Sequence, residues 1–275
     1  MSGASESVGE ARQARLDDCR ERLRGLGGAV VAISGGVDSS LLLALAVEAL
    51  GARNVLAAHA TGPIFAKRED DQARGLARHL GVELVEIEAA PLDDAAFAAN
   101  PPDRCYHCKR AIFGRLKALA AERGLAAVLS GANADDPGDH RPGLRAESEL
   151  GIRQPLREAG LTKADIRAAA GALKLPTRDA PSSACLASRI PYGEPITAGK
   201  LARIEQAEEA LHAMGFGQCR VRDHGAVARI ELLSDDMPEG VRQRERIVGA
   251  VKAAGYAYVA LDLAGFRSGS MNEVL

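Results

Sequence analysis

The sequence has no tryptophan and few other aromatic residues, with four Tyr and five Phe among 275 residues. This shortage argues against the aromatic platforms on which single-stranded nucleic acids stack. Charge of one sign is also lacking, because 35 Lys and Arg face 37 Asp and Glu for a formal net charge of −2. Without a global basic field to hold nucleic acid, we expect a small-molecule substrate and no nucleic-acid partner.

Long apolar runs are missing too. Charged residues or glycine interrupt every apolar stretch before it reaches the length of a membrane span. The first residues, MSGASESVGEARQARLDD, are polar and mixed in charge, unlike a secretory signal or a transit peptide. We therefore expect a cytoplasmic protein without membrane contact. An odd cysteine count in a reducing compartment favours metal or redox chemistry over disulfides; the five are Cys19, Cys105, Cys108, Cys185 and Cys219.

Short apolar segments alternate with helical patterns through the first part of the chain. The segments AVVAIS, NVLAAHA, VELVEIEA and AAVLSGAN predict four strands, with a helix after each of the first three. This alternation is typical of an open α/β fold with a parallel sheet and right-handed crossovers. After a Pro- and Ser-rich loop, a helix, a hairpin, a second helix near 238–254 and a last strand predict a smaller C-terminal α/β domain. We place the two domains at residues 1–178 and 179–275.

A glycine-rich motif, SGGVDSS, lies between the first predicted strand and the next helix. Glycines let backbone N–H groups approach a phosphate, the helix N-terminus adds a positive dipole, and serine hydroxyls add donors. The motif has neither the Gly-Lys-Ser/Thr ending of the Walker loop nor the dinucleotide fingerprint, so it places no lysine at a γ-phosphate. The alternative is a serine-capped turn without a ligand. The candidate phosphate-binding residues are Ser34, Gly35, Gly36, Val37, Asp38, Ser39 and Ser40.

Other polar residues follow the predicted strands, where open parallel sheets bind ligands. His59 ends the second strand, where it either approaches a bound adenosine or caps the strand. Gly131 and Asn133 follow the fourth strand. Asp135 and Asp136 either assist a Mg²⁺ ion or form a solvated turn.

The cysteines suggest a second constellation. Cys105 and Cys108 form a C-x-x-C at the start of a predicted helix, which fits a redox dithiol, half a zinc site, part of a cluster site, or two buried helical cysteines. If the fold brings Cys185 beside them, three thiolates converge. A zinc ion then needs a fourth ligand, for which His107 is nearest, whereas an iron–sulfur cube keeps one open iron. Arg189 is placed to lower the pKa of the Cys185 thiol. We interpret Cys19 and Cys219 as structural.

The C-terminal part adds charged candidates. Arg220 and Arg222 are two residues apart on a predicted strand and therefore share one face. They either clamp a phosphate or form a solvated hairpin face. Glu208 and Glu231 are acidic candidates, although a solvated surface position is the expectation for Glu208. The last segment contributes Arg267 and Ser268, which either line the substrate pocket or take part in a subunit contact.

Taken together, the motifs SGGVDSS, SGANADD with DHRPG, SSACLASRIPYGEPIT and VALDLAGFRSGSMN resemble one family over nearly the whole chain. These are the ATP-dependent sacrificial sulfur transferases of the LarE family, which make the nickel-pincer nucleotide cofactor of lactate racemase. The loop and C-terminal segments are the more diagnostic, because SGGVDSS occurs in many adenylating enzymes. The resemblance implies an adenine nucleotide alpha hydrolase-like fold, that is, a Rossmann-like PP-loop domain.

The resemblance also implies a reaction. ATP adenylates a carboxylate of pyridinium-3,5-biscarboxylic acid mononucleotide, with Asp38 as a Mg²⁺ contact, and sulfur then displaces AMP. In the sacrificial version the sulfur belongs to the residue at Cys185, which ends as dehydroalanine. In another group three cysteines hold a [4Fe–4S] cluster, and Cys105, Cys108 and Cys185 match that group. We therefore expect the cluster-bearing version, and a homo-oligomer, with hexamer as the leading hypothesis.

Two rival interpretations stay open. One is another adenylating enzyme with the same loop, such as a tRNA thiolase or an ammonia-using amidotransferase. The other is a non-enzymatic nucleotide-binding module that carries a structural zinc.

Overall fold

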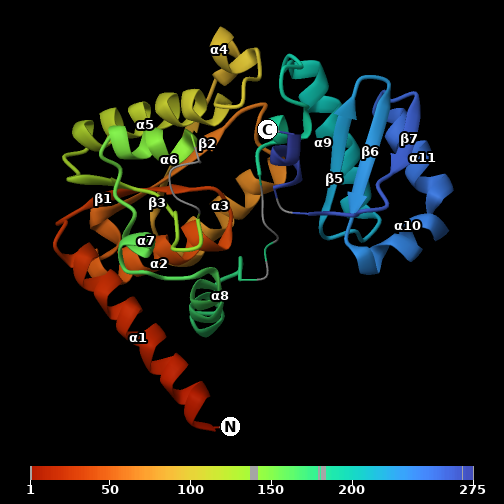
Figure 1. Cartoon of the computed structure of the whole chain (residues 1–275). Coiled ribbons are helices and arrows are strands. Elements are labelled where there is room, and N and C mark those ends of the chain that lie inside the picture. Colours follow the sequence, from red (N-terminus) through yellow and green to blue (C-terminus); the bar gives the residue numbers. More distant parts are fainter. Residues whose placement is uncertain (1, 137–141, 179, 181–183, 268, 275) are drawn as a thin grey trace. The chain divides into compact units, whose positions relative to one another are not determined.

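The structure is a computed structural model, and it describes residues 2–136, 142–178, 180, 184–267 and 269–274. Contacts divide the chain into two compact units (Figure 1). The first consists of Met1–Gly62, Lys67–Ala89 and Cys105–Ser182, and the second of Pro63–Ala66, Ala90–Arg104 and Ser183–Leu275. The second unit thus takes two short segments from the N-terminal part of the chain in addition to its C-terminal residues.

The first unit is built on a four-stranded sheet with the order β3-β2-β1-β4, in which every pairing is parallel. This confirms the open parallel α/β sheet that the sequence predicts. Its strands are β1 Ala29–Ile33, β2 Val55–Thr61, β3 Glu83–Glu88 and β4 Ala127–Leu129. Its helices are α1 Ser2–Arg24, α2 Val37–Leu50, α3 Lys67–Leu80, α5 Arg104–Glu122, α6 Pro142–Glu149, α7 Pro155–Glu158 and α8 Lys163–Ala172.

Strand β1 shows why this sheet is covered on both faces. Its residues are buried almost without exception and alternate between two apolar clusters, with Val31 in one and Val30 in the other. Helices α1, α2, α3, α7 and α8 supply the first cluster, and α5 supplies the second (Figure 1). A strand buried on both faces has no polar alternation, which explains the continuous apolar run in the sequence.

The second unit contains a three-stranded sheet with the order β5-β6-β7. The predicted hairpin is present, since β5 (Cys219–His224) and β6 (Val227–Leu232) pair antiparallel, and β7 (Tyr258–Leu261) then joins β6 in parallel. The predicted helix near 238–254 is divided into two helices at Gln243. Helical hydrogen bonds nevertheless continue across this residue, because the Gln243 N–H donates to the Glu239 carbonyl and the Ile247 N–H donates to the Gln243 carbonyl. The helices of this unit are α4 Ala95–Ala98, α9 Ala198–Ala213, α10 Met237–Arg242 and α11 Arg244–Ala253.

Two cysteines belong to the apolar interiors. Cys19 and Cys219 are fully buried, one in the core of each unit. Burial raises the pKa of the Cys19 thiol to about 12, so this cysteine is a neutral core residue at physiological pH.

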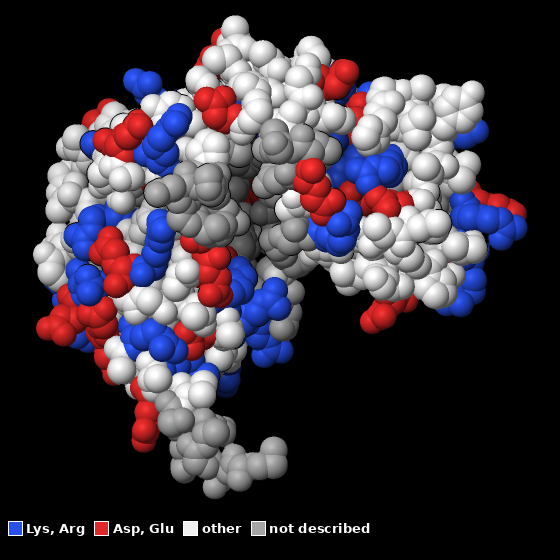
Figure 2. Space-filling view, in the orientation of Figure 1, with Lys and Arg blue, Asp and Glu red and all other residues white. Residues whose placement is uncertain are grey.

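The exposed surface carries both signs of charge. On the face drawn in Figure 2, blue Lys and Arg side chains lie interspersed with red Asp and Glu side chains. Among the described helices, none combines the length and the apolar character that crossing a bilayer demands.

Candidate functional site

The SGGVDSS segment forms a tight loop between β1 and α2. Gly35 adopts φ +76°, and a Cβ atom there would lie 3.2 Å from the Glu69 carbonyl oxygen, so both conformation and space require glycine. Gly131, after β4, approaches the first turn of α2 so closely that a Cβ atom would lie 2.8 Å from the Ser39 nitrogen. The carboxyl ends of β1 and β4 and the start of α2 are therefore packed together at one edge of the sheet.

The serines of the loop bond mainly to the loop itself. The Ser39 hydroxyl accepts a hydrogen bond from the Ser34 N–H at 3.2 Å and donates to the Gly36 carbonyl at 3.1 Å. The Ser40 hydroxyl donates to the same carbonyl at 2.8 Å. Both hydroxyls thus shape the turn, and the first-turn N–H groups of α2, which have no acceptor within the helix, are the donors left for an anion.

Asp38, in the first turn of α2, is held from two other elements. Its carboxylate accepts a hydrogen bond from Asn133 Nδ2 at 3.3 Å and forms an ion pair with Lys163 Nζ. Asp135 and Asp136 have backbone partners, since Asp135 accepts from the Lys163 N–H and Asp136 from the Asn133 N–H. Mg²⁺ is commonly bound by one or two carboxylates together with substrate phosphates, so the single carboxylate of Asp38 fits that donor set.

Lys163 is the residue of this site that sequence reasoning missed. Thr162 caps the N-terminus of α8 and forms a capping box with Asp165. A lysine directly after a helix cap resembles any surface lysine. Its partner lies 125 residues away, and no local pattern connects the two.

His59 is 2% exposed on β2, and protein atoms engage both of its ring nitrogens. Nδ1 lies 3.0 Å from the Ile33 carbonyl oxygen, and Nε2 lies 2.8 Å from Asp70 Oδ1 on α3. The ring ties α3 to the carboxyl end of β1, which corresponds to the strand-capping alternative.

Cys105 and Cys108 lie within the first five residues of α5, three residues apart and so on one face of the helix. Cys105 is exposed, Cys108 is half-buried, and neither forms a disulfide. The neighbouring Tyr106 and Lys109 anchor this turn to α6, because Tyr106 donates to Glu149 at 2.6 Å and Lys109 pairs with the fully buried Glu147. The pair is therefore presented on a fixed and accessible helix end.

Cys185 directly precedes a short 3-10 helix, Leu186–Arg189, and is half-buried. Arg189 is 1% exposed and donates to the Cys185 carbonyl at 3.0 Å. It also forms two parallel hydrogen bonds with Glu208 of α9, at 2.9 and 2.8 Å. The guanidinium thus fixes the main chain at the cysteine. Its influence on the thiol stays a prediction.

The surface position expected for Glu208 is wrong. Its side chain is 3% exposed and accepts a hydrogen bond from the Val221 N–H at 2.9 Å in addition to the two from Arg189. Burial alone would raise the pKa of this carboxyl, but the charge and hydrogen bonds of Arg189, with smaller contributions from Arg220 and Val221, bring it below its usual value. Glu208 is therefore a buried anion that holds Arg189, because packing of α9 against β5 removes it from water.

The solvated hairpin face that we considered for Arg220 and Arg222 is wrong as well, since both are about 95% buried. Arg222 forms two parallel bonds with Glu231 at 2.9 and 2.7 Å, and Arg220 donates to the Cys219 carbonyl at 2.7 Å. Burial, assisted by the charge of Arg189, lowers the pKa of Arg220 to about 10, so it remains a cation at neutral pH.

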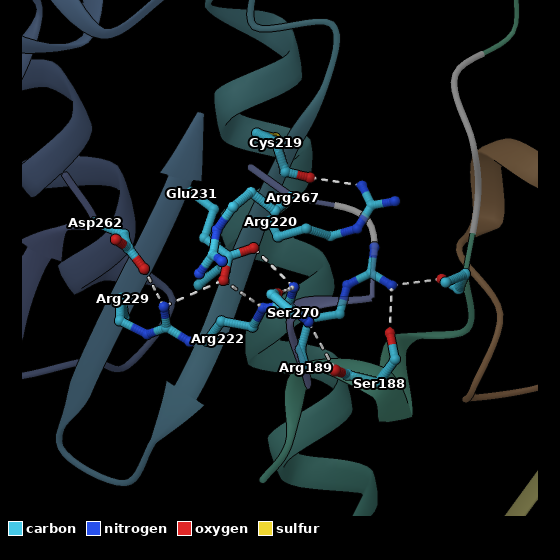
Figure 3. A network of polar contacts seen from close by, with 12 residues as sticks. Ser188, Arg189, Cys219, Arg220, Arg222, Arg229, Glu231, Asp262, Arg267 and Ser270 are labelled. Carbon is cyan, nitrogen blue, oxygen red and sulfur yellow. Dashed lines mark hydrogen bonds and ion pairs between the residues drawn. The ribbon is translucent and has the colours of Figure 1, made fainter. Parts of the chain in front are cut away.

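Ser188 joins the two arginine–glutamate pairs through Arg189 and Arg222. Its hydroxyl accepts from Arg189 at 3.0 Å, and its carbonyl accepts from Arg222 at 2.8 Å (Figure 3). Ser270 accepts from Arg222 at 3.0 Å, whereas Arg267 is half-exposed and pairs with Glu273. Ser268 lies outside the described residues.

The cysteines are distributed over both units: Cys105 and Cys108 belong to the first and Cys185 to the second. Within the part of the chain that the structure describes, no group of three or more His, Cys, Asp or Glu side chains is arranged to hold a metal ion. The convergence of the three thiols therefore stays a prediction.

Comparison with known proteins extends this description. The NAD synthase family matches residues 16–119, which include the SGGVDSS loop. The NH(3)-dependent NAD(+) synthetase of Methanococcoides burtonii is 43% identical over 94 residues, which is 34% of this chain and 36% of the relative. The match to the NAD synthase family thus includes the SGGVDSS loop but covers less than half of the chain.

Two relatives match almost from end to end. An uncharacterized protein of Synechocystis is 37% identical over 265 residues, 96% of this chain and 98% of the relative. The pyridinium-3,5-bisthiocarboxylic acid mononucleotide synthase of Lactiplantibacillus plantarum is 40% identical over 253 residues, 92% of each chain. Since the similarity extends over 92% of both chains, this chain belongs to the family of pyridinium-3,5-bisthiocarboxylic acid mononucleotide synthases, which are enzymes with a PP-loop ATP-binding domain.

Proposed function

We propose that this enzyme uses ATP to transfer sulfur to the carboxylates of pyridinium-3,5-biscarboxylic acid mononucleotide and so forms the bisthiocarboxylic acid. The observation that carries the proposal is the loop at residues 34–40, in which the conformation at Gly35 requires glycine and the first N–H groups of α2 are left for a phosphate. The loop belongs to a chain that matches the synthase over 92% of its length. In this proposal the product is an intermediate in the biosynthesis of the nickel-pincer nucleotide cofactor of lactate racemase.

Adenylation explains why such a reaction needs ATP. A carboxylate is a poor electrophile, because its leaving group would be oxide. In the first step a carboxylate oxygen attacks the α-phosphorus of ATP, and pyrophosphate leaves. In the second a sulfur nucleophile attacks the carbonyl carbon, and AMP leaves with the C–O electron pair. The α2 N-terminus would neutralise phosphate charge, and Asp38 would hold the Mg²⁺ that assists it.

For the sulfur donor we propose a [4Fe–4S] cluster held by Cys105, Cys108 and Cys185. The support is the donor set: three cysteines free of disulfides, two of them one helical turn apart and accessible. When bound, the cluster would supply sulfide through its open iron. Within the chain, Tyr106 and Lys109 fix the helix end that carries the pair, and Arg189 fixes the main chain of the third cysteine.

A second version follows from Cys185 alone. Its half-buried position and the carbonyl anchor from Arg189 suit a thiolate that attacks the adenylated carboxylate itself. The resulting thioester releases thiocarboxylate when the Cα proton is lost and the Cβ–S bond breaks, which leaves dehydroalanine. This version stops after one sulfur per chain, whereas the cluster version turns over.

The mononucleotide phosphate is the ligand that we propose for the arginines of the second unit. Arg189, Arg220 and Arg222 are three buried cations, and the buried carboxylates near them are those of Glu208 and Glu231. Figure 3 shows the three arginines with Glu231. Guanidinium groups suit phosphate oxygens in number and geometry. The family resemblance further supports a homo-oligomer, with hexamer as our hypothesis.

The test uses anaerobically purified protein with ATP, Mg²⁺ and the pyridinium substrate. We expect pyrophosphate release that depends on the substrate, and a product in which sulfur replaces carboxyl oxygen by mass spectrometry. Iron with cubane-type absorption and more than one sulfur per chain would support the cluster. A protein mass reduced by that of H₂S would support sacrifice of Cys185. Zinc without iron, and no pyrophosphate release, would support the non-enzymatic module and contradict the proposal.

A further inference from the structure

Two segments of the second unit adjoin the cysteines that we propose as cluster ligands. One of them, Ala90–Arg104, leads directly into Cys105, and the other follows Cys185. A main-chain hydrogen bond joins the two segments, from the Gly193 N–H to the Asn100 carbonyl at 3.0 Å. The chain before one cysteine is therefore fastened to the chain after another.

The side chain of Asn100 adds a second connection between the same segments. It is fully buried, and Nδ2 donates to the Pro191 carbonyl at 2.7 Å and to the Glu194 carbonyl at 3.0 Å. The Ile190 carbonyl oxygen lies 3.3 Å from the same nitrogen. On its other side, Oδ1 accepts a hydrogen bond from Arg104 Nη1 at 2.9 Å. Since acceptors surround the nitrogen and a donor faces the oxygen, the orientation of the amide is fixed.

The backbone at Asn100 restricts the residue type further. Its φ is +58°, in the left-handed region that glycine, asparagine and aspartate adopt more readily than other residues. Glycine has no side chain to bond with, and an ionised aspartate has no hydrogen to donate to a carbonyl. Asparagine therefore supplies the conformation, the donors and the acceptor together.

Arg104 connects this amide to the start of α5. Its side chain is 3% exposed, and the guanidinium carbon lies 4.4 Å from the centre of the Tyr192 ring, in a cation–π contact. Tyr192 belongs to the segment that follows Cys185, as do the carbonyls that Asn100 binds. Because Cys105 is the next residue after Arg104 in the helix, the position of its main chain depends on these contacts.

The two cysteines lie at equal distances along the chain from this network. Cys105 comes five residues after Asn100, and Cys185 comes five residues before Ile190. On the Cys185 side the connection is the 3-10 helix Leu186–Arg189. A 3-10 helix rises only about 2 Å per residue and is held by its own hydrogen bonds. A movement of the network would therefore carry this cysteine with it.

We propose that Asn100, acting through Arg104, is a positioning residue that holds Cys105 and Cys185 at the separation that one iron–sulfur cluster requires. This inference rests on the proposed function, in the version in which three cysteines hold a [4Fe–4S] cluster. Ligating side chains depend on neighbours that orient them, and the loss of such a neighbour commonly weakens metal binding by about tenfold to a hundredfold.

The experiment measures how readily the thiols meet in the full-length chain before any cluster is bound. Anaerobically purified protein is stripped of metal with a chelator and treated with a short bismaleimide. Cross-links between Cys185 and the pair Cys105 and Cys108 are then quantified by peptide mass spectrometry. In parallel, a monofunctional maleimide reports the reactivity of each thiol by itself.

Two variants of Asn100 are compared with a matched control. Asn100→Asp keeps the acceptor for Arg104 but loses the donors, and Asn100→Gly removes the side chain while tolerating the positive φ. The control is Asn54→Asp. Asn54 also donates to a main-chain carbonyl, that of Leu50 at 2.9 Å, but it is exposed and belongs to the first unit.

We expect both Asn100 variants to form the cross-link about tenfold more slowly or less, because the two thiols lose their effective concentration. Asn54→Asp should stay within about twofold of the wild type. Monofunctional labelling of each accessible thiol should keep its wild-type rate, since the variants change a distance and not a reactivity. Iron–sulfur reconstitution of the Asn100 variants should give correspondingly less cubane-type absorption.

Each other outcome has a defined meaning. A wild-type chain that forms no such cross-link would overturn the cluster hypothesis together with this inference, whereas pyrophosphate release tests adenylation independently. A wild-type cross-link that both Asn100 variants leave unchanged would overturn the inference alone. Slowing in Asn100→Asp but not in Asn100→Gly would attribute the effect to the added charge and contradict it as well. Maleimide labelling of the buried Cys19 and Cys219 in the variants would assign Asn100 to the stability of the whole fold, which also overturns it.

Discussion

The charged pairs of the two units are built differently. In the first unit Lys163 and Asp38 meet at a partly exposed helix end, through one flexible ammonium. In the second unit Arg189–Glu208 and Arg222–Glu231 are almost fully buried, and each pair is joined by two parallel hydrogen bonds. A planar guanidinium locked on a carboxylate holds one geometry, whereas an exposed lysine can change partners. The first unit thus keeps a mobile cation at a candidate nucleotide loop, and the second keeps fixed cations around Cys185.

The largest expected effect is that of Cys185→Ala, which should separate sulfur transfer from adenylation. We expect Cys185→Ala to abolish sulfur transfer while pyrophosphate release continues, because the nucleotide loop lies in the first unit and the thiol in the second. Product mass spectrometry and a pyrophosphate assay on the same sample provide the measurement. Cys19→Ala, at a buried core cysteine, serves as the control and should retain both activities. Joint loss of both in Cys185→Ala would instead mean that this residue mainly supports folding.

A second prediction tests whether the buried pairs are structural. Glu208→Gln leaves the Arg189 cation buried without its counter-ion, so we expect the free energy of unfolding to fall by about 3 to 5 kcal/mol. Urea denaturation followed by circular dichroism measures it. The control, Glu194→Gln, removes the exposed partner of Lys200 and should cost at most about 0.5 kcal/mol. A loss below about 1 kcal/mol in Glu208→Gln would contradict the structural role that we assign to the pair.

Two Gly→Ala substitutions in the first unit should change the free energy of unfolding by smaller amounts and in opposite directions. Gly131→Ala places a Cβ atom 2.8 Å from the Ser39 nitrogen, and the main chain must move. We expect a loss of about 1 to 3 kcal/mol and weaker ATP binding. Gly114→Ala, in α5 with no atom within 4 Å of the new Cβ, should instead stabilise by about 0.5 to 1 kcal/mol. A Gly131→Ala variant as stable as the wild type in thermal denaturation would show that the close approach of Gly131 to α2 does not constrain the fold.

The smallest expected effect on stability concerns the capping box of α8, which Thr162 and Asp165 form next to Lys163. Burial raises the pKa of Asp165, but hydrogen bonds from Thr162 and Arg15 outweigh it and bring the pKa below the ordinary value of 3.8. A lowered pKa in the folded protein stabilises above pH 3.8, and that contribution disappears as the pH falls through the folded value. Asp165→Asn should therefore cost about 1 kcal/mol at pH 7 and progressively less towards pH 3. A cost independent of pH in urea titrations would show that the carboxylate charge contributes nothing.

Local signals account for what the sequence determined by itself. Alternating apolar and helical segments predicted the parallel sheet, because a strand buried on both faces and an amphipathic helix are each encoded within about ten residues. The loop at residues 34–40 was identified as a glycine-rich turn for the same reason: the residues that form it are neighbours in the chain.

Tertiary structure alone decided which charges are buried and which meet. Glu208 lies in the run EQAEEAL, where its neighbours are charged and exposure is the natural expectation, but packing against β5 and Arg189 removes it from water. Lys163 reaches Asp38 across 125 residues because α2 and α8 pack against each other and both begin at the same edge of the sheet. Long-range contacts of this kind depend on the packing of whole elements, and no pattern confined to one segment of the sequence records them.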